Sequence, residues 1–300
     1  MKFLFFFLSL FAFSQQQVAN GVVLDKESNK PIPYVNISIL ESTVGTSSDD
    51  DGSYTLHIKN EDLSKNVKLS SLGYNDTTIV VSNFIKLDKV RLTPLVEQLD
   101  EVVISEKFEE KTMIVNEILE EDLCAGYGSH AENPWIVALY FPFISNYEDT
   151  DFLKSVRFHF GNFKNKKGKF RLRLFSVGND SLPDQDLMKE NVIVSLKKNQ
   201  KTVDVDISEC SLIFPREGFY IAIEWLYIPY NEQKIVYVDG PKNKNKRKGI
   251  KYSPTISATC EEEGKYKVAV YNSGVWSSYL ARAYKKEGQW IPAISLTLSN

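Results

Sequence analysis

The stretch YVNISIL at residues 34–40 decides the fold of the first third of the chain. Its apolar residues Val35, Ile37 and Ile39 alternate with the polar or amphipathic Tyr34, Asn36 and Ser38. Successive side chains of a strand point to opposite faces, so this spacing predicts a strand with one face in a core.

The same alternation recurs in the segments that follow, at SYTLHI (53–58) and VKLSSLGY (67–74). The turn between the first two strands is predicted at 49–52, DDDG, because Asp caps nearby backbone and Gly takes a positive φ at low cost. An EF-hand-like calcium loop is the alternative, but it needs acids at alternate positions and a distant Glu. Short strands separated by turns predict an antiparallel sandwich over residues 15–105.

Several motifs in this region resemble one family, the carboxypeptidase regulatory-like domain. They are GVVLD (21–25), PIPYVNI (31–37), GT (45–46), DGSY (51–54), SLGY (71–74) and LDEVV (99–103). The resemblance implies a transthyretin-like, seven-stranded β-sandwich without catalytic groups of its own. It also implies an exported or outer-membrane setting of the kind found in Bacteroidota, often ahead of the plug of TonB-dependent receptors.

The first 14 residues are predicted to be a signal peptide. Lys2 precedes an apolar run over residues 3–13, and Ala12 and Ser14 give a small-residue cleavage pattern before Gln15. The run is shorter than the ~20 residues that a membrane-spanning helix requires. No Cys follows the cleavage site, and we expect export without a lipid anchor, to the periplasm, the outer membrane or the cell exterior.

Residues 106–125 are predicted to be a helical linker. Ile114, Val115, Ile118 and Leu119 recur at helical spacing with acidic residues between them, which indicates an amphipathic helix. An acidic docking segment is the alternative reading of the same pattern.

Alternation returns over residues 126–300, which we expect to form a second, larger β-sandwich of jelly-roll type. Its strands are marked by FRLRLFSV (170–177), VDVDI (203–207) and FYIAIEW (219–225), and helical segments do not separate them. The chain of 300 residues is long enough for two such cores. The fold class is therefore predicted to be all-β.

The composition weakens several functional classes. The net charge of −3 supplies no general attraction for nucleic acid. A zinc peptidase needs His-x-x-Glu and a further His, whereas the three histidines lie apart without ligand spacing: His57, His130 and His159. The three cysteines allow at most one pair, and the sequence leaves open which two would form it: Cys124, Cys210 and Cys260. We expect no metal or cofactor.

Acidic residues are the remaining candidates for catalysis, because a glycosidase needs only two carboxyl groups. Asp204 and Asp206 share one strand face, and Glu224 lies between Ile223 and Trp225. Burial would raise the pKa of Glu224 as a general acid requires, but pairing with an arginine is equally compatible with the sequence. The candidate arginines are Arg157, Arg171 and Arg173.

Two surface features could serve binding. Trp276, Tyr279 and Trp290 form an aromatic group that could hold sugar, although Trp276 suits a core position better. The basic runs at 164–169 and 242–249 are predicted hairpin tips that could touch anionic lipid or polysaccharide.

These observations predict an exported, non-enzymatic two-domain β-protein that binds an envelope protein or glycan. A glycan-acting hydrolase with paired carboxylates is one alternative. An accessory component of TonB-dependent uptake is another, because residues 99–105 are similar to the stretch that leads into receptor plugs, although no plug follows.

Overall fold

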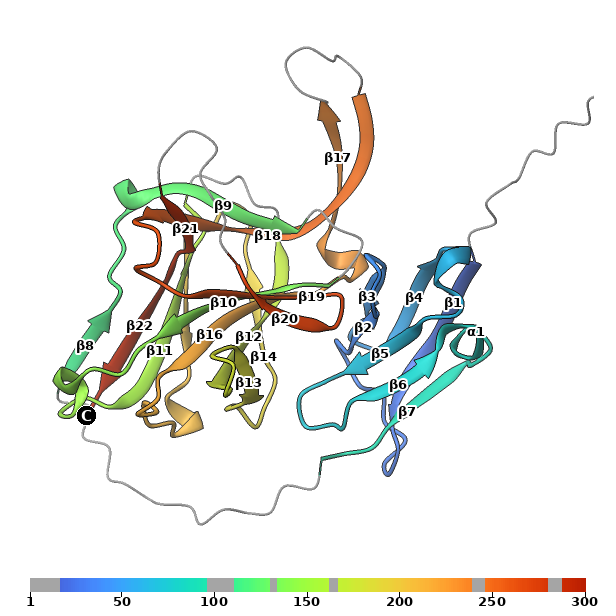
Figure 1. The fold of residues 1–300 in the computed structure, drawn as a ribbon, viewed down its shortest axis with the longest axis horizontal. Helices are drawn as coiled ribbons and strands as arrows, with labels where there is room; N and C mark the ends of the chain where they lie inside the picture. The colour runs from blue at the N-terminus through green and yellow to red at the C-terminus, as the bar shows by residue number, and fades with distance from the viewer. Residues whose placement is uncertain (1–16, 96–110, 130–133, 162–166, 239–245, 280–287) are drawn as a thin grey trace, which may run out of the picture.

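The computed structural model describes residues 17–95, 111–129, 134–161, 167–238, 246–279 and 288–300. They form two β-sheet bodies that lie side by side, as Figure 1 shows. The predicted signal peptide and the LDEVV motif fall outside the described residues. Within them, no helix combines the length and apolar character needed to cross a membrane.

The first domain is a sandwich of two small sheets, with seven strands in its described residues. One sheet has the order β4-β1-β7: β4 (Ser53–Ile58), β1 (Gln17–Asp25) and β7 (Lys89–Leu92). The other has the order β3-β2-β5-β6: β3 (Gly45–Ser47), β2 (Asn36–Ile39), β5 (Asn66–Ser70) and β6 (Thr77–Val80). One short helix, α1 (Val81–Phe84), follows β6. The predicted seven-stranded sandwich is confirmed.

The predicted turn at residues 49–52 is present. Gly52 has a φ of +77°, and its N–H donates to the carbonyl of Asp49 at 3.0 Å. The Asp51 carboxylate accepts the backbone N–H of Ser53, and hydrogen bonding from Ser53 lowers the pKa of Asp51. These acids therefore stabilise the turn, as expected from their local hydrogen-bonding capacity.

The second domain is built on a seven-stranded sheet that faces a four-stranded sheet. The large sheet holds β10 (Ile136–Phe141), β12 (Gly168–Val177), β13 (Pro183–Asp186), β14 (Val192–Leu196), β16 (Phe219–Trp225), β19 (Val268–Asn272) and β20 (Val275–Ser278). The smaller sheet has the order β15-β11-β22-β8: β15 (Thr202–Asp206), β11 (Phe152–His159), β22 (Ile294–Ser299) and β8 (Thr112–Val115).

A further sheet lies at one end of the second domain. It consists of β17 (Glu232–Val238), β18 (Lys246–Glu261), β21 (Gln289–Pro292) and β9 (Leu123–Ser129). Short 3-10 turns connect some of the strands: Asn60–Asp62 in the first domain, and Glu120–Asp122, Ser145–Tyr147, Ser208–Cys210 and Pro229–Asn231 in the second.

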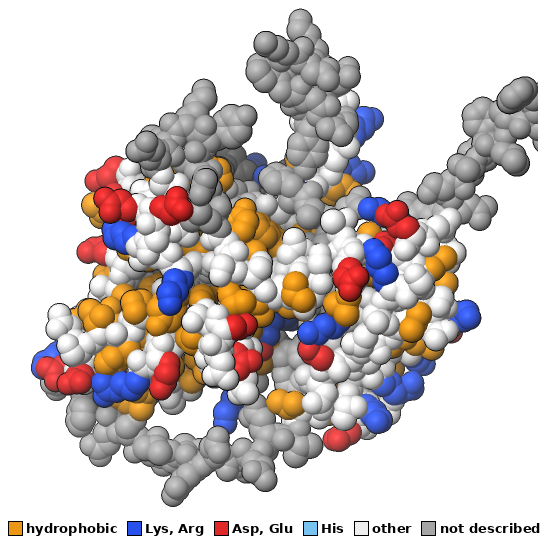
Figure 2. All heavy atoms as spheres, in the orientation of Figure 1, with side chains coloured by type: hydrophobic (Ala, Val, Ile, Leu, Met, Phe, Trp, Pro, Cys, Tyr) orange, Lys and Arg blue, Asp and Glu red, His pale blue; other side chains and the backbone are white. Residues whose placement is uncertain are grey.

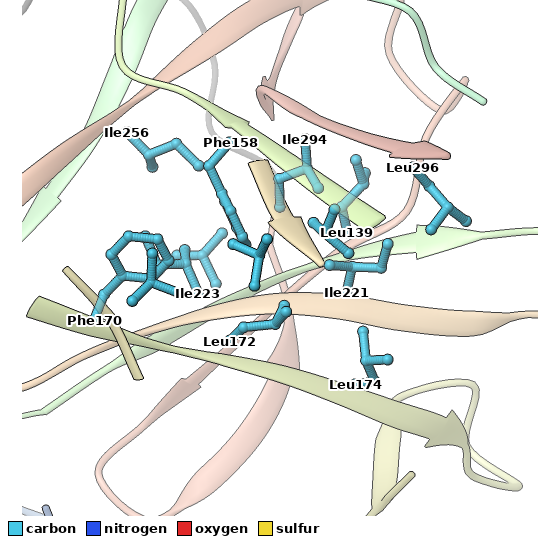
Figure 3. Close-up of a cluster of buried hydrophobic side chains, with 14 of the residues drawn as sticks. Leu139, Phe158, Phe170, Leu172, Leu174, Ile221, Ile223, Ile256, Ile294 and Leu296 are labelled. Atoms are coloured by element: carbon cyan, nitrogen blue, oxygen red, sulfur yellow. The ribbon is translucent and has the colours of Figure 1, made fainter. Parts of the chain in front are cut away.

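The inner faces of the sheets share one apolar core. Figure 3 shows side chains from opposing strands meeting there, among them Leu172 of β12, Ile221 of β16, Phe158 of β11 and Leu296 of β22. Each of the four is at most 1% exposed. The residues predicted to face inward from period-two alternation therefore form the core of an all-β fold, and the predicted fold class is confirmed.

The predicted linker helix is wrong over the residues that the structure describes. Thr112–Val115 is a strand that pairs antiparallel with β22, and Leu123–Ser129 is a strand that pairs with β18. Met113 and Val115 pack against the core, whereas Ile114 is 49% exposed, so the local period is two. The free edge of β22 offers hydrogen bonds that outweigh a weak helical pattern. Residues 106–110 lie outside the described part.

Candidate functional site

The chemically richest described site lies where the first domain covers the outer face of the large sheet. In β12, Phe170, Leu172 and Leu174 point into the core, so Arg171 and Arg173 point to the other face. In the antiparallel register, Arg171 of β12 lies directly opposite Glu224 of β16. All seven residues of β16 are buried, because both faces of this strand are covered.

Glu224 is the centre of this site. Its Oε2 accepts a hydrogen bond from Arg171 Nη1 at 3.0 Å and lies 3.5 Å from Arg173 Nη1. Its Oε1 lies 3.5 Å from Asn36 Nδ2 of the first domain. The side chains of Arg171 and Glu224 are each 1% exposed. One carboxylate therefore bonds to groups from both domains.

Arg171 extends the network into the first domain. Its Nη2 donates to the backbone carbonyl of Tyr34 at 2.6 Å. Tyr34 has a φ of +58°, a left-handed conformation that is uncommon for an aromatic residue. The Tyr34 hydroxyl in turn accepts a hydrogen bond from Lys169 Nζ at 2.9 Å. The backbone of the first domain thus takes an uncommon conformation at the point where it meets the arginine.

The electrostatics of the site keep Glu224 ionised. Burial alone would raise the pKa of this carboxyl, but the charges of Arg171 and Arg173, with hydrogen bonds from Arg171 and Asn36, lower it below its ordinary value. Arg173 also pairs with Asp186, and despite its burial the two carboxylates raise the pKa of its guanidinium. Glu224 is therefore paired with arginine, one of the readings that the sequence left open, and its pKa is shifted in the direction opposite to the one a general acid requires.

Apolar and backbone contacts extend the contact between the two domains, here called the junction, beyond the charged groups. Tyr34 packs with the buried Leu226 and Ile228 of the second domain. Tyr227 donates its N–H to Ser47 Oγ at 3.0 Å, which places the second domain against the edge strand β3. An edge strand otherwise presents unpaired backbone groups to solvent. The junction therefore also protects this edge.

One glycine allows a close approach between the two domains. Gly274, in the turn between β19 and β20, has a φ of +90°. A Cβ at this position would overlap Leu40 Cδ2 of the first domain. Nearby, Ser273 Oγ donates to the carbonyl of Ser42 at 2.7 Å.

The other candidate acids lie on an open surface. Asp204 receives two hydrogen bonds from Arg157, at 2.6 Å from Nε and 3.1 Å from Nη2. Asp206 is exposed and accepts the backbone N–H of Ser208 at 2.9 Å. Arg157 therefore pairs with Asp204 and not with Glu224, and the structure keeps the two groups of acids apart on different sheets.

The histidines and cysteines that the structure describes do not come together as a ligand set. His57 is exposed on β4, and His159 of β11 is buried beside Ser295 of β22. His130 lies outside the described residues. Burial and the charge of Arg157 lower the pKa of His159. Within the described ranges, no group of three His, Cys, Asp or Glu residues is placed to hold a metal ion. Cys124 and Cys260 form a disulfide, which resolves the pairing that the sequence left open.

The three aromatic residues considered for sugar binding do not form one platform. Tyr279 and Trp290 both contact Tyr127, with ring centroids 6.3 Å and 6.5 Å away. Trp276 instead lies edge-on to Phe175 and Tyr271, at 5.2 Å and 5.4 Å. Trp276 is half-buried on the outer face of the large sheet, so it is neither a core residue nor fully exposed.

Comparison with known proteins identifies the first domain. Residues 19–104 match the family model of the CarboxypepD_reg-like domain. The resemblance seen in the sequence motifs is thereby confirmed for the N-terminal part of the chain. No curated protein matches the chain.

The sequence points to Glu224, Arg171 and Arg173 but not to Asn36 or the Tyr34 carbonyl. A signal for them exists in β2, where the alternation places Asn36 and Ser38 on the face opposite the core. Both are buried, at 2% and 1% exposed, because the second domain covers that face. This face carries small polar residues and lacks the charged side chains that are usual on a solvated strand. That composition is the feature of the sequence that indicates burial.

Proposed function

We propose that the protein is an exported, non-enzymatic binding or structural module of the cell envelope in which the two β-domains act as one body. The observation that carries this proposal is the position of Glu224. This carboxylate is ionised, buried and bonded to Arg171, and it lies beside Asn36 of the other domain.

The chemistry of Glu224 supports a structural role. A general acid must hold a proton near its working pH and must reach substrate. Glu224 is 0% exposed, and its two oxygens already face three nitrogen donors. Its geometry instead suits a fixed connection between two domains, because a buried ion pair is strongly dependent on both partners.

The resemblance of the first domain supports the envelope setting. The CarboxypepD_reg-like match covers residues 19–104, and the predicted signal peptide precedes it. In this proposal the first domain is a scaffold that holds the larger domain in a fixed orientation at the envelope. The ligand would be an envelope protein or glycan contacted by the larger domain.

A polysaccharide assay tests the non-enzymatic part of the proposal. We expect the purified protein to release no reducing ends from envelope polysaccharides above the buffer rate. Asp204→Asn and Glu224→Gln are the informative variants. Turnover by the unaltered protein that either substitution abolishes, in a variant that circular dichroism shows to be folded, would establish the hydrolase alternative.

Cell fractionation tests the setting. The expected result is a chain in the periplasmic or outer-membrane fraction whose N-terminus is Gln15 by mass spectrometry. A chain that retains Met1 and remains in the cytoplasm would contradict export.

A further inference from the structure

The β17–β18 hairpin extends away from both domains, as Figure 1 shows. Its strands pair antiparallel from Glu232↔Tyr252 to Val238↔Lys246. At the base, Tyr252 packs on Tyr227 with ring centroids 4.2 Å apart. Beyond Tyr252 the buried Gln233 bonds to Ser253, and further along the hairpin the described side chains at 234, 236, 246, 248 and 250 are exposed.

One face of this hairpin combines lysines with exposed aliphatic residues. Lys234 lies opposite Ile250, and Val236 lies opposite Lys248, so these four side chains share a face. Lys246, two residues before Lys248, belongs to the same face. Val236 is 58% exposed and Ile250 is 43% exposed, and all three lysines are exposed. We call these five residues the hairpin face.

The charge of the hairpin face is positive. Glu232, near Tyr252 at the base, is the one acid on the described part of the two strands' shared face. Among the described residues, no salt bridge occupies Lys234, Lys246 or Lys248. Cationic side chains stand along this part of the molecule in Figure 2. The chain as a whole carries −3, so the positive charge here is a local property.

We propose that the hairpin face binds the surface of an anionic lipid bilayer. Lysines gain free energy beside anionic headgroups, and aliphatic side chains between them gain it by entering the boundary between headgroups and acyl chains. Lys and Val or Ile alternate on this face, so the charged groups can reach the headgroups while the aliphatic groups enter the boundary region at the same depth. This inference deepens the proposed envelope role and rests on it for its biological setting.

Two other occupants fit the hairpin face less well. An anionic polysaccharide would pair with the lysines but would leave Val236 and Ile250 in water. A second copy of the chain could pair with β17, which is an edge strand. Lys234 opposes that pairing, because a lysine on an edge strand places charge against an incoming strand.

Vesicle sedimentation tests the proposal with the chain from Gln15 onward, which omits the apolar leader and contains every described residue. We expect binding to vesicles of equal phosphatidylglycerol and phosphatidylcholine at 0.1 M salt, and little binding to pure phosphatidylcholine. The triple variant Lys234→Gln, Lys246→Gln, Lys248→Gln should bind about 100-fold more weakly, since each lysine near the surface contributes about fivefold. Val236→Ser with Ile250→Ser should weaken binding at least about tenfold.

A matched control has the same loss of charge elsewhere. Lys86, Lys197 and Lys198 are exposed and lie off the hairpin, so replacing all three by Gln should leave vesicle binding within about threefold of the unaltered protein. All the substitutions are at exposed positions, and circular dichroism would verify that each variant is folded.

Three results would overturn the proposal. They are absence of binding to the anionic vesicles, an equal loss in the control variant, and binding to dextran sulfate that matches vesicle binding and is unaffected by Val236→Ser with Ile250→Ser. The last result would assign the face to anionic polymers. Because these measurements use vesicles alone, their failure would leave the polysaccharide and fractionation tests of the proposed function unaffected.

Discussion

Two arginine–carboxylate pairs in the second domain have the same cross-strand placement and opposite surroundings. Arg171 lies opposite Glu224 on β12 and β16, and Arg157 lies opposite Asp204 on β11 and β15. The side chains are 1% and 1% exposed in the first pair, and 47% and 54% exposed in the second. The difference comes from the first domain, which covers one pair and leaves the other in water.

This difference determines what each pair contributes. An exposed pair is screened by water, and its ordering cost nearly offsets its attraction. A buried pair has already lost its hydration, so each charge depends on its partner. At the Glu224 site, the Tyr34 carbonyl and the Asn36 amide of the first domain also offset the loss of hydration. The buried pair therefore couples the stability of the two domains.

The largest expected effect comes from neutralising the buried carboxylate. Glu224→Gln leaves Arg171 buried without a counter-charge and should lower the free energy of unfolding by about 3–5 kcal/mol. Urea denaturation followed by tryptophan fluorescence measures this change. Asp204→Asn is the matched control, because it makes the same carboxylate-to-amide change at the exposed pair. A loss for Glu224→Gln no larger than that of the control would break the contrast between the pairs.

The second prediction concerns acid stability. The pKa of Glu224 is below its ordinary value of 4.5 in the folded protein. Its contribution is therefore fully present above pH 4.5, where it is ionised in both states, and is lost as pH falls through the depressed folded pKa. The stability difference between the unaltered protein and Glu224→Gln should narrow from pH 6 to pH 3.

Urea midpoints at several pH values test this prediction. Other acids whose pKa is lowered, such as Asp25 and Asp51, are present in both proteins and cancel in the difference. A difference that stays constant through this range would show that Glu224 does not titrate with folding.

The smallest effect is expected at the exposed pair. Arg157→Ala removes both hydrogen bonds to Asp204 and should cost at most about 1 kcal/mol. A double-mutant cycle with Asp204→Ala isolates the pair from other contacts of each residue. The interaction energy should shrink further in 1 M salt. A coupling of 3 kcal/mol or more would mean that exposure does not distinguish the two pairs.

The strands could be predicted from the sequence where one face packs into a core. Val35, Ile37 and Ile39 are each 0% exposed, and the alternation in β12 places Leu172 and Leu174 correctly in the core. Local periodicity is sufficient here because burial of one face and the pleat of the strand impose the same pattern.

The site could be predicted only in part, because the burial of an outward-facing side chain depends on what covers the outer face of its sheet. Arg171 and Arg157 occupy equivalent outward positions on their strands, and no local pattern shows that a second domain covers one of them. The helix predicted at 106–125 failed for a related reason: β8 forms by pairing with β22, which lies almost two hundred residues later in the chain. Such pairings are tertiary contacts that override local propensity.

The most direct test of the coupling is whether the two domains unfold together. All four tryptophans lie in the second domain, so their fluorescence reports on that domain alone. Hydrogen exchange of peptides that cover β2 reports on the first domain. Both signals should change at the same urea concentration in the unaltered protein and at separate concentrations in Glu224→Gln. Two separate transitions in the unaltered protein would contradict the account.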